Sequence, residues 1–279
     1  MKFIYFLGID GHYDQTKHYE EYVTTIASIE SVITNGRVDI ENVYVITNSD
    51  DVKKRLDIEF EKGLTIIKIT NSRYTKNDNY VMTKFRSVIE TADGLVSQGH
   101  DVVIMPDSSL CIVDDLEDKL VFLKEPRSYM TESWNVMGKW VDVIASGDPN
   151  KRLLYTKFLK DNNCLNKPLL DNAIQFFPSN SDSSRMVFGL LNSYINQLYK
   201  EDEYVWGLDK LIYTVAMYNI GCGGNELREL RYVWHTRTAR QKYIINLHSC
   251  NISMLYDTGI VGKYNRENPI EKLINLKHS

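Results

Sequence analysis

Four short apolar segments, in which polar and apolar residues do not alternate, occur within the first 105 residues of this chain. Polar turns bound them, and two segments with a helical spacing of apolar residues lie between them. Such strands are buried on both faces of a sheet, and parallel neighbours need crossover helices. The pattern therefore predicts an α/β fold with a mostly parallel, twisted central sheet flanked by helices. We expect strands at 2–7, 42–47, 64–69 and 102–105, and helices at 19–34 and 83–98.

The rest of the chain continues this pattern less regularly. Neither a linker, an internal repeat nor a low-complexity segment divides the 279 residues, so we predict a single domain over 1–279. Gly99 stands where a helix C-cap prefers glycine and is expected to end the second helix. The further elements expected are helices near 150–160, 183–199, 203–219 and 268–276, and strands at 173–177 and 243–247.

Charge and composition narrow the partners and the compartment. A net charge of -4 argues against a generally basic nucleic-acid binder, although it is compatible with a local basic surface. The first apolar run is too short for a signal peptide or a membrane span, so we expect a cytoplasmic protein. The four cysteines lack CxxC spacing and lie in or beside apolar segments, which predicts reduced, mostly buried thiols. Frequent Asn, Lys, Ile and Tyr suggest an AT-rich coding source such as a phage or a low-GC bacterium.

Several common catalytic motifs are absent from the sequence. It contains no G-x-G-x-x-G after the first strand and no G-x-x-x-x-G-K-[ST], which argues against a dinucleotide dehydrogenase and a P-loop NTPase. It also lacks G-x-S-x-G and H-E-x-x-H, which lowers the case for a serine hydrolase or a zinc protease. The glycine-rich stretch at 221–226 follows a predicted helix and is interpreted as a turn.

The segment at 101–120 brings polar groups to the end of a buried strand. Its apolar run stops at Pro106, and Asp107, Ser108 and Ser109 follow. In open α/β sheets, ligands bind beyond the carboxyl ends of the strands. A carboxylate there can accept hydrogen bonds from a sugar hydroxyl or coordinate a divalent cation that bridges two phosphates. The alternative is an Asp-Ser turn that only stops the strand.

This segment resembles the Asp-x-Asp region of GT-A fold glycosyltransferases, especially the glycogenin-like branch. In that family a strand leads into two aspartates, followed by a second apolar strand and an acidic turn. Asp107 falls on the first aspartate, which typically contacts the donor. Ser109 falls on the second, which typically ligates the metal. The serine is a departure that puts tight metal binding in doubt.

Three later segments resemble the same family in the same order. Asn172 matches the asparagine of the family's F-N-A-G strand, and Asp209 matches the aspartate of its G-D-Q helix, where Lys210 replaces the glutamine. His248 matches the histidine that completes the metal site. The resemblance implies a metal-assisted transfer of a sugar, with Asp209 as the catalytic residue. Asp107 and His248 would hold a divalent cation, Mn²⁺ or Mg²⁺, in a weak or even dispensable site.

The same resemblance divides the chain into two functional halves. The nucleotide-sugar half spans about 1–120 and the acceptor half about 121–279, which includes the C-terminal helix. We expect a UDP-sugar as the donor. The donor-binding candidates are Phe6, Asp10, Asn48, Lys84, Arg86, Asp107 and Ser109, and the acceptor-binding candidates are Asn172, Trp234, Arg237 and Arg240.

The basic stretch at 227–243 is compatible with more than one class of acceptor. Its arginines and aromatic residues could follow a phosphate backbone and stack a base, or could clamp the donor diphosphate. The acceptor is therefore a saccharide, a small molecule, a protein side chain or DNA, the last as a hydroxymethylated base of a phage. A rival interpretation is a non-catalytic binding protein on the same fold, which Ser109 and Lys210 would suit.

Overall fold

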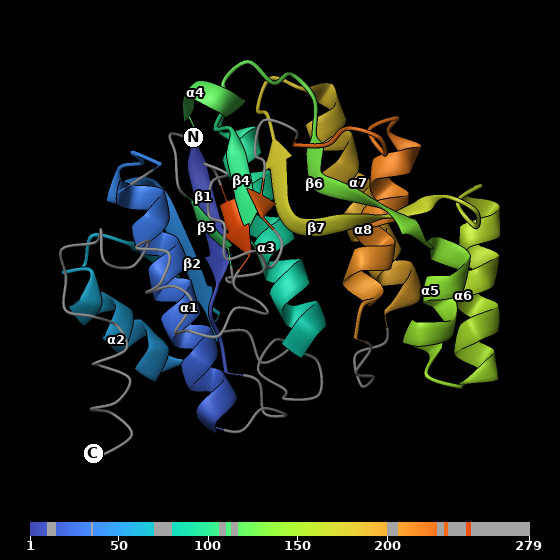
Figure 1. The fold of residues 1–279 in the computed structure, drawn as a ribbon, viewed down its shortest axis with the longest axis horizontal. Coiled ribbons are helices and arrows are strands. Elements are labelled where there is room, and N and C mark those ends of the chain that lie inside the picture. Colours follow the sequence, from blue (N-terminus) through green and yellow to red (C-terminus); the bar gives the residue numbers. More distant parts are fainter. Residues whose placement is uncertain are drawn as a thin grey trace.

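A six-stranded mixed sheet forms the centre of the molecule (Figure 1). The computed structural model describes residues 1–9, 15–34, 36–69, 80–105, 110–112, 117–199, 206–227, 232–233 and 244–246. The strand order is β3-β2-β1-β4-β7-β6, and the first four of these strands are parallel. β7 runs antiparallel to both β4 and β6. The strands are β1 (Lys2–Phe6), β2 (Val43–Thr47), β3 (Thr65–Lys68), β4 (Val102–Met105), β6 (Arg127–Val136) and β7 (Pro168–Phe177).

Helices cover both faces of this sheet. α5 and α6 lie side by side at the end of the molecule farthest from α1 and α2 (Figure 1). The helices are α1 (Gln15–Thr34), α2 (Asp50–Glu59), α3 (Tyr80–Ser97), α4 (Glu117–Leu120), α5 (Met137–Ala145), α6 (Pro149–Asp161), α7 (Asp182–Leu198) and α8 (Leu208–Asn219), with a 3-10 turn η1 (Ile40–Asn42). A small second sheet has the order β5-β9-β8, formed by β5 (Leu110–Ile112), β9 (Ile244–Asn246) and β8 (Tyr232–Val233).

Two hydrophobic cores follow from the alternation of side chains along the buried strands. Ile4 and Phe6 of β1 face the larger core, which α3, α7 and α8 cover. Phe3 and Tyr5 face the opposite core, which packs against α1 and α2. Successive side chains of a strand point to opposite faces, so the uninterrupted apolar runs of the sequence serve both cores.

The structure confirms the predicted parallel half, with element boundaries within a few residues of those expected. The C-cap prediction for α3 is also confirmed, because Gly99 has a φ of 87° and the His100 N–H donates to the Leu95 carbonyl at 3.0 Å. The helices predicted near 150–160, 183–199 and 203–219 correspond to α6, α7 and α8. The helix expected at 268–276 lies outside the described residues.

Four elements differ from the expectation. The residues after β2, expected to form one of the polar turns that bound the strands, instead begin α2, and Ser49 caps this helix by accepting the Val52 N–H at 3.4 Å. β6 and α5 were not expected, and β7 begins at Pro168, five residues before the expected 173. Among the described residues, no helix is both long and apolar enough to cross a bilayer.

Candidate functional site at the carboxyl edge of the sheet

The parallel strands end together at one edge of the sheet. β1, β2 and β4 finish at Phe6, Thr47 and Met105, and this is the edge where open α/β sheets bind ligands. β7 meets this edge from the opposite direction, with Gln175 paired to Ile104. Because β7 is antiparallel to β4, its residues before Gln175 extend beyond the carboxyl end of β4. Asn172 therefore lies on the ligand-binding side of the sheet.

Phe6 and Asn48, both predicted to bind the donor, lie together at this edge. Phe6 is fully buried, and its ring packs edge-on against Tyr80 at 5.5 Å between centroids. The Asn48 amide binds the backbone of Ile9 twice, accepting the N–H at 2.8 Å and donating to the carbonyl at 3.1 Å. A Cβ on Gly8 would come within 2.7 Å of both Phe6 and Asn48, so this turn is tightly packed.

An irregularity in β7 sets the direction of Asn172. The pairing between β6 and β7 shifts between Ser128 and Met130, where β7 carries extra residues. Such bulges bend a strand and re-aim its side chains. The Asp171 carboxylate stabilises this bend by accepting the Ala173 N–H at 2.8 Å, and the Gln175 amide donates to the Asn172 carbonyl at 3.2 Å. The backbone of Asn172 is therefore held on both sides.

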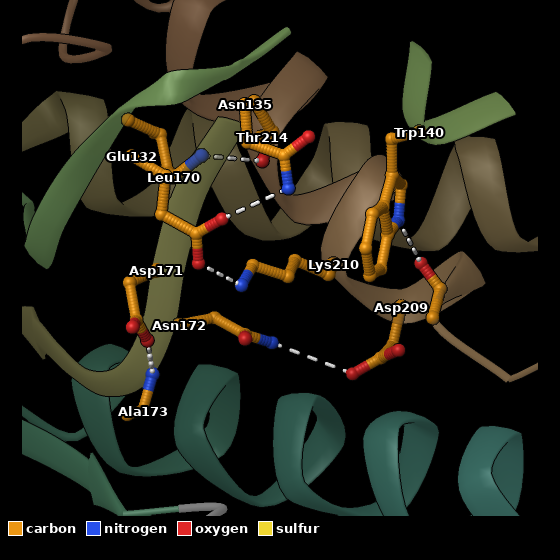
Figure 2. Close-up of polar contacts among 11 residues, drawn as sticks. Glu132, Asn135, Trp140, Leu170, Asp171, Asn172, Ala173, Asp209, Lys210 and Thr214 are labelled. Carbon is orange, nitrogen blue, oxygen red and sulfur yellow. Dashed lines mark hydrogen bonds and ion pairs between the residues drawn. The ribbon is translucent and has the colours of Figure 1, made fainter. Parts of the chain in front are cut away.

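Asp209 lies in the first turn of α8 and faces Asn172 (Figure 2). The Asn172 amide donates to the Asp209 carboxylate at 3.4 Å. Desolvation raises the pKa of Asp209, and this outweighs the opposing effects of the Lys210 backbone N–H, Asn172 and the cations of Lys84 and Lys210. A carboxylate whose charge is poorly compensated is typical of functional sites.

A buried ion pair lies beside Asp209. The Lys210 ammonium donates to one carboxylate oxygen of Glu132 on β6, and the Asn135 amide donates to the other at 3.2 Å (Figure 2). The two charged side chains are only 18% and 12% exposed. Lys210 is therefore paired with Glu132, and its charge, together with that of Lys84, does not offset the desolvation of Asp209.

Hydrogen bonds from neighbouring elements fix the start of α8. The Trp140 indole on α5 donates to the Gly207 carbonyl at 3.1 Å, and the buried Thr214 hydroxyl accepts the Leu170 N–H of β7 at 3.2 Å (Figure 2). Gly207 itself has a φ of 80°, a conformation that favours glycine. These contacts hold Asp209 in register with Asn172.

The structure separates the two basic residues predicted on α3. Lys84 is near enough to lower the pKa of Asp209. Arg86 instead binds Asn196 of α7 at 3.3 Å, and its guanidinium lies 5.7 Å from the centroid of the Tyr199 ring. Residues two positions apart on a helix do not share a face, which explains why only Lys84 joins the site.

The remaining predicted site residues lie outside the part of the chain that the structure describes. They are Asp10, Asp107, Ser109, Trp234, Arg237, Arg240 and His248. Within the described part, no group of three or more His, Cys, Asp or Glu side chains is arranged to hold a metal ion. Cys164 and Cys222 are free and buried as predicted, and burial raises the pKa of the Cys222 thiol to about 11.

Glu132, Asn135 and Trp140 were not predicted as site residues from the sequence. Glu132 and Lys210 are 78 positions apart, and no local pattern links them. The available signal was a lone glutamate in the mixed segment 127–136, which has neither clear helical nor clear strand periodicity. A buried lysine next to the catalytic candidate requires a carboxylate partner, but the sequence does not indicate which one.

Comparisons with known proteins support the architecture. No protein-family model matches the sequence, and no curated protein sequence matches it. Among solved structures, the chain is similar to the apo form of mouse xyloside xylosyltransferase 1, with a TM-score of 0.51 and 9% identity over 90% of this chain and 98% of that one. Core-mannan synthase A from Aspergillus fumigatus, in a Mn/GDP form, aligns with a TM-score of 0.39 and 7% identity over 78% of this chain and 69% of that one. The first match confirms the predicted fold: this chain has the α/β architecture of GT-A glycosyltransferases.

Proposed function

We propose that the chain is a glycosyltransferase that moves a sugar from a nucleoside-diphosphate sugar to an acceptor hydroxyl. One observation carries the proposal. Asp209, desolvated and with a raised pKa, faces Asn172 at the carboxyl edge of a GT-A-like sheet. The ordered motif resemblance from Asp107 to His248 favours the glycogenin-like branch of that family.

Asp209 suits the chemistry of the anomeric carbon. In the transfer, the acceptor oxygen bonds to this carbon, and the bond to the diphosphate oxygen breaks with its electron pair leaving on the diphosphate. The hydroxyl proton is lost to a base. A carboxylate with a raised pKa is a better proton acceptor than an ordinary one, and its negative charge stabilises positive charge at the sugar. Asn172 orients this carboxylate through its amide.

The departing diphosphate requires positive charge. Lys84 is close enough for its charge to lower the pKa of Asp209, and we assign it to the diphosphate. A divalent ion would supply further charge neutralisation, with Asp107 and His248 as its proposed ligands. An oxygen and a nitrogen ligand suit Mn²⁺ better than Mg²⁺. The roles of Asp209, Asn172 and Lys84 do not depend on that ion.

The nucleotide is assigned to the edge formed by β1 and β2. Phe6 and Asn48 shape the turn at Gly8 and Ile9, and Asp10 follows that turn directly. The acceptor is assigned to the second half, where Asn172 lies, with Trp234, Arg237 and Arg240 as further candidates. We propose a UDP-sugar as the donor.

A thermal-shift screen with nucleoside diphosphates and sugar nucleotides tests the proposal. Each ligand is added with Mn²⁺, with Mg²⁺ or with chelator. A ligand at one hundred times its dissociation constant adds about 2.7 kcal/mol to the free energy of unfolding, a readily measured shift. We expect one donor to stabilise the protein and Asp107→Ala to weaken that effect. The proposal fails if no nucleotide stabilises the protein under any of these conditions.

Turnover separates an enzyme from a binding protein on the same fold. The donor that stabilises the protein is incubated with it, with and without candidate acceptors, and released nucleoside diphosphate is measured. We expect release that Asp209→Asn abolishes while donor binding remains. Donor binding without any release would establish the non-catalytic interpretation instead.

A further inference from the structure

An exposed tryptophan lies immediately before the start of α8. Trp206 is 56% exposed, although it is one of the largest apolar side chains of the protein. Its ring packs against Trp140 of α5, with 5.4 Å between centroids and an interplanar angle of 51°. Trp206 thus offers one part of its indole to solvent while another part rests on a second indole.

The backbone beneath this pair is fixed. The Trp140 indole N–H donates to the carbonyl of Gly207 at 3.1 Å. A Cβ on Gly207 would lie 2.8 Å from Trp140 and 3.2 Å from Ile144, and the φ of 80° would strain any other residue. The segment is therefore specialised to hold Trp206 against Trp140, and the exposed ring is a preorganised surface.

Polar groups flank this aromatic surface. The Lys210 ammonium lies 5.8 Å from the centroid of the Trp140 ring and is bound to Glu132. The catalytic candidate Asp209 follows Trp206 by three positions and lies in the first turn of α8. A flat apolar face bordered by charged hydrogen-bonding groups matches a pyranose ring, which has an apolar C–H face and a rim of hydroxyls.

We propose that Trp206, supported by Trp140, is the stacking platform for the acceptor's sugar ring. This inference rests on the proposed glycosyltransferase function and identifies its acceptor as a saccharide. The order of the sheet favours the acceptor over the nucleotide base. Trp140 follows β6 at one edge of the sheet, whereas the proposed nucleotide site lies at β1 and β2, with β4 and β7 in between.

Intrinsic tryptophan fluorescence of the full chain tests the platform directly. The probes are methyl β-D-xylopyranoside, methyl β-D-glucopyranoside and methyl α-D-mannopyranoside, titrated in the presence of saturating uridine diphosphate. We expect at least one glycoside to change the emission in a saturable way. Trp206→Ala is expected to weaken that binding about tenfold, and Trp206→Phe to retain most of it. The alanine variant should fold, because the side chain it removes is largely exposed.

The exposed Phe122, far from the described site in sequence, provides the matched control. It is 78% exposed, and Phe122→Ala should leave glycoside binding unchanged. The inference is overturned if no glycoside binds, or if Trp206→Ala binds the glycosides as well as the parent does. It is also overturned if Trp206→Ala instead loses the thermal shift given by uridine diphosphate, since the ring would then stack the nucleotide base.

Failure of the platform and failure of the proposed function give different results. If nucleotides stabilise both the parent and Trp206→Ala while glycoside binding is insensitive to Trp206, only the platform is wrong. If no nucleotide stabilises either protein, the transferase proposal is wrong, and a saccharide acceptor is overturned with it.

Discussion

The two ends of the carboxyl edge differ in how completely their polar side chains are hydrogen-bonded. At the β1–β2 end, both functional groups of the Asn48 amide are satisfied by the backbone of Ile9, and Phe6 is completely buried. At the β7–α8 end, the Asp209 carboxylate accepts one side-chain hydrogen bond from the residues that the structure describes, at 3.4 Å, and desolvation is the largest effect on its pKa. The first arrangement is one that structure alone explains. The second costs stability, which makes it the better indicator of function.

The sharpest way to break this comparison is to neutralise Asp209. Because its charge is proposed to act at the anomeric carbon, Asp209→Asn should lower the transfer rate about 10²–10⁴-fold, measured as nucleoside diphosphate release. Asp93 on α3 is the matched control, since desolvation also raises its pKa but it lies in the later part of that helix. Equal losses in Asp93→Asn and Asp209→Asn would remove the distinction between the two ends.

The ion pair beside Asp209 gives the next largest effect. Glu132→Ala leaves the Lys210 ammonium largely buried without its partner, and we expect the free energy of unfolding to fall by about 3 kcal/mol in urea denaturation. The exposed pair between Arg152 and Asp142, at 2.8 Å, is the control. Asp142→Ala should change stability by less than about 1 kcal/mol. Similar losses for the two variants would mean that the Glu132 pair is no more than a surface contact.

Asn48 tests the satisfied end of the edge. Asn48→Ala removes both hydrogen bonds to Ile9, and because these bonds are partly exposed we expect a loss of about 1 kcal/mol in the free energy of unfolding. As a proposed donor-binding residue, Asn48 should also affect the thermal shift given by the donor. If that shift keeps its full size in Asn48→Ala, Asn48 only clamps the turn.

The smallest effect concerns stability and pH at Asp209. Burial raises the folded-state pKa of this group above its ordinary value of 3.8, so the folded protein binds the proton more tightly than the unfolded chain does. The cost of holding the charge is therefore absent below pH 3.8 and grows as the pH rises through the folded pKa. Asp209→Asn should therefore be more stable than the parent at pH 7, and this advantage should vanish on acidification. Thermal melts from pH 3 to 7 measure it, and an advantage that grows toward low pH would contradict the burial argument.

The parallel half of the fold was predictable because its signals are local. Each buried strand is a short apolar run, and the stripes of α1 and α3 are long enough to read by periodicity. α2 was missed because only Val52 and Leu56 of its ten residues are buried, so it reads as a polar segment. β6 was missed because its pairing with β7 is irregular, which disrupts the alternation expected of a strand.

The site was only partly predictable. Asn172 and Asp209 were selected through the family resemblance, and the structure brings their side chains together. The cationic partner of Glu132 could not be inferred, because the pair joins segments that meet only through tertiary packing. Trp206 was not predicted for a related reason. Its exposure and its contact with Trp140 depend on how α5 packs against the start of α8.

The antiparallel β7 has a further consequence for the way the chain is made. β7 lies along one side of β4, whose four residues Val102–Met105 are all apolar and completely buried. Until β7 has been synthesised, β4 pairs only with β1, and its other edge is an exposed apolar strand edge, the type of surface that promotes aggregation. At the usual rate of about 5–20 residues per second, the nascent chain exposes this edge for several seconds. The strand that carries Asn172 into the site thus also protects the newly made sheet from other chains.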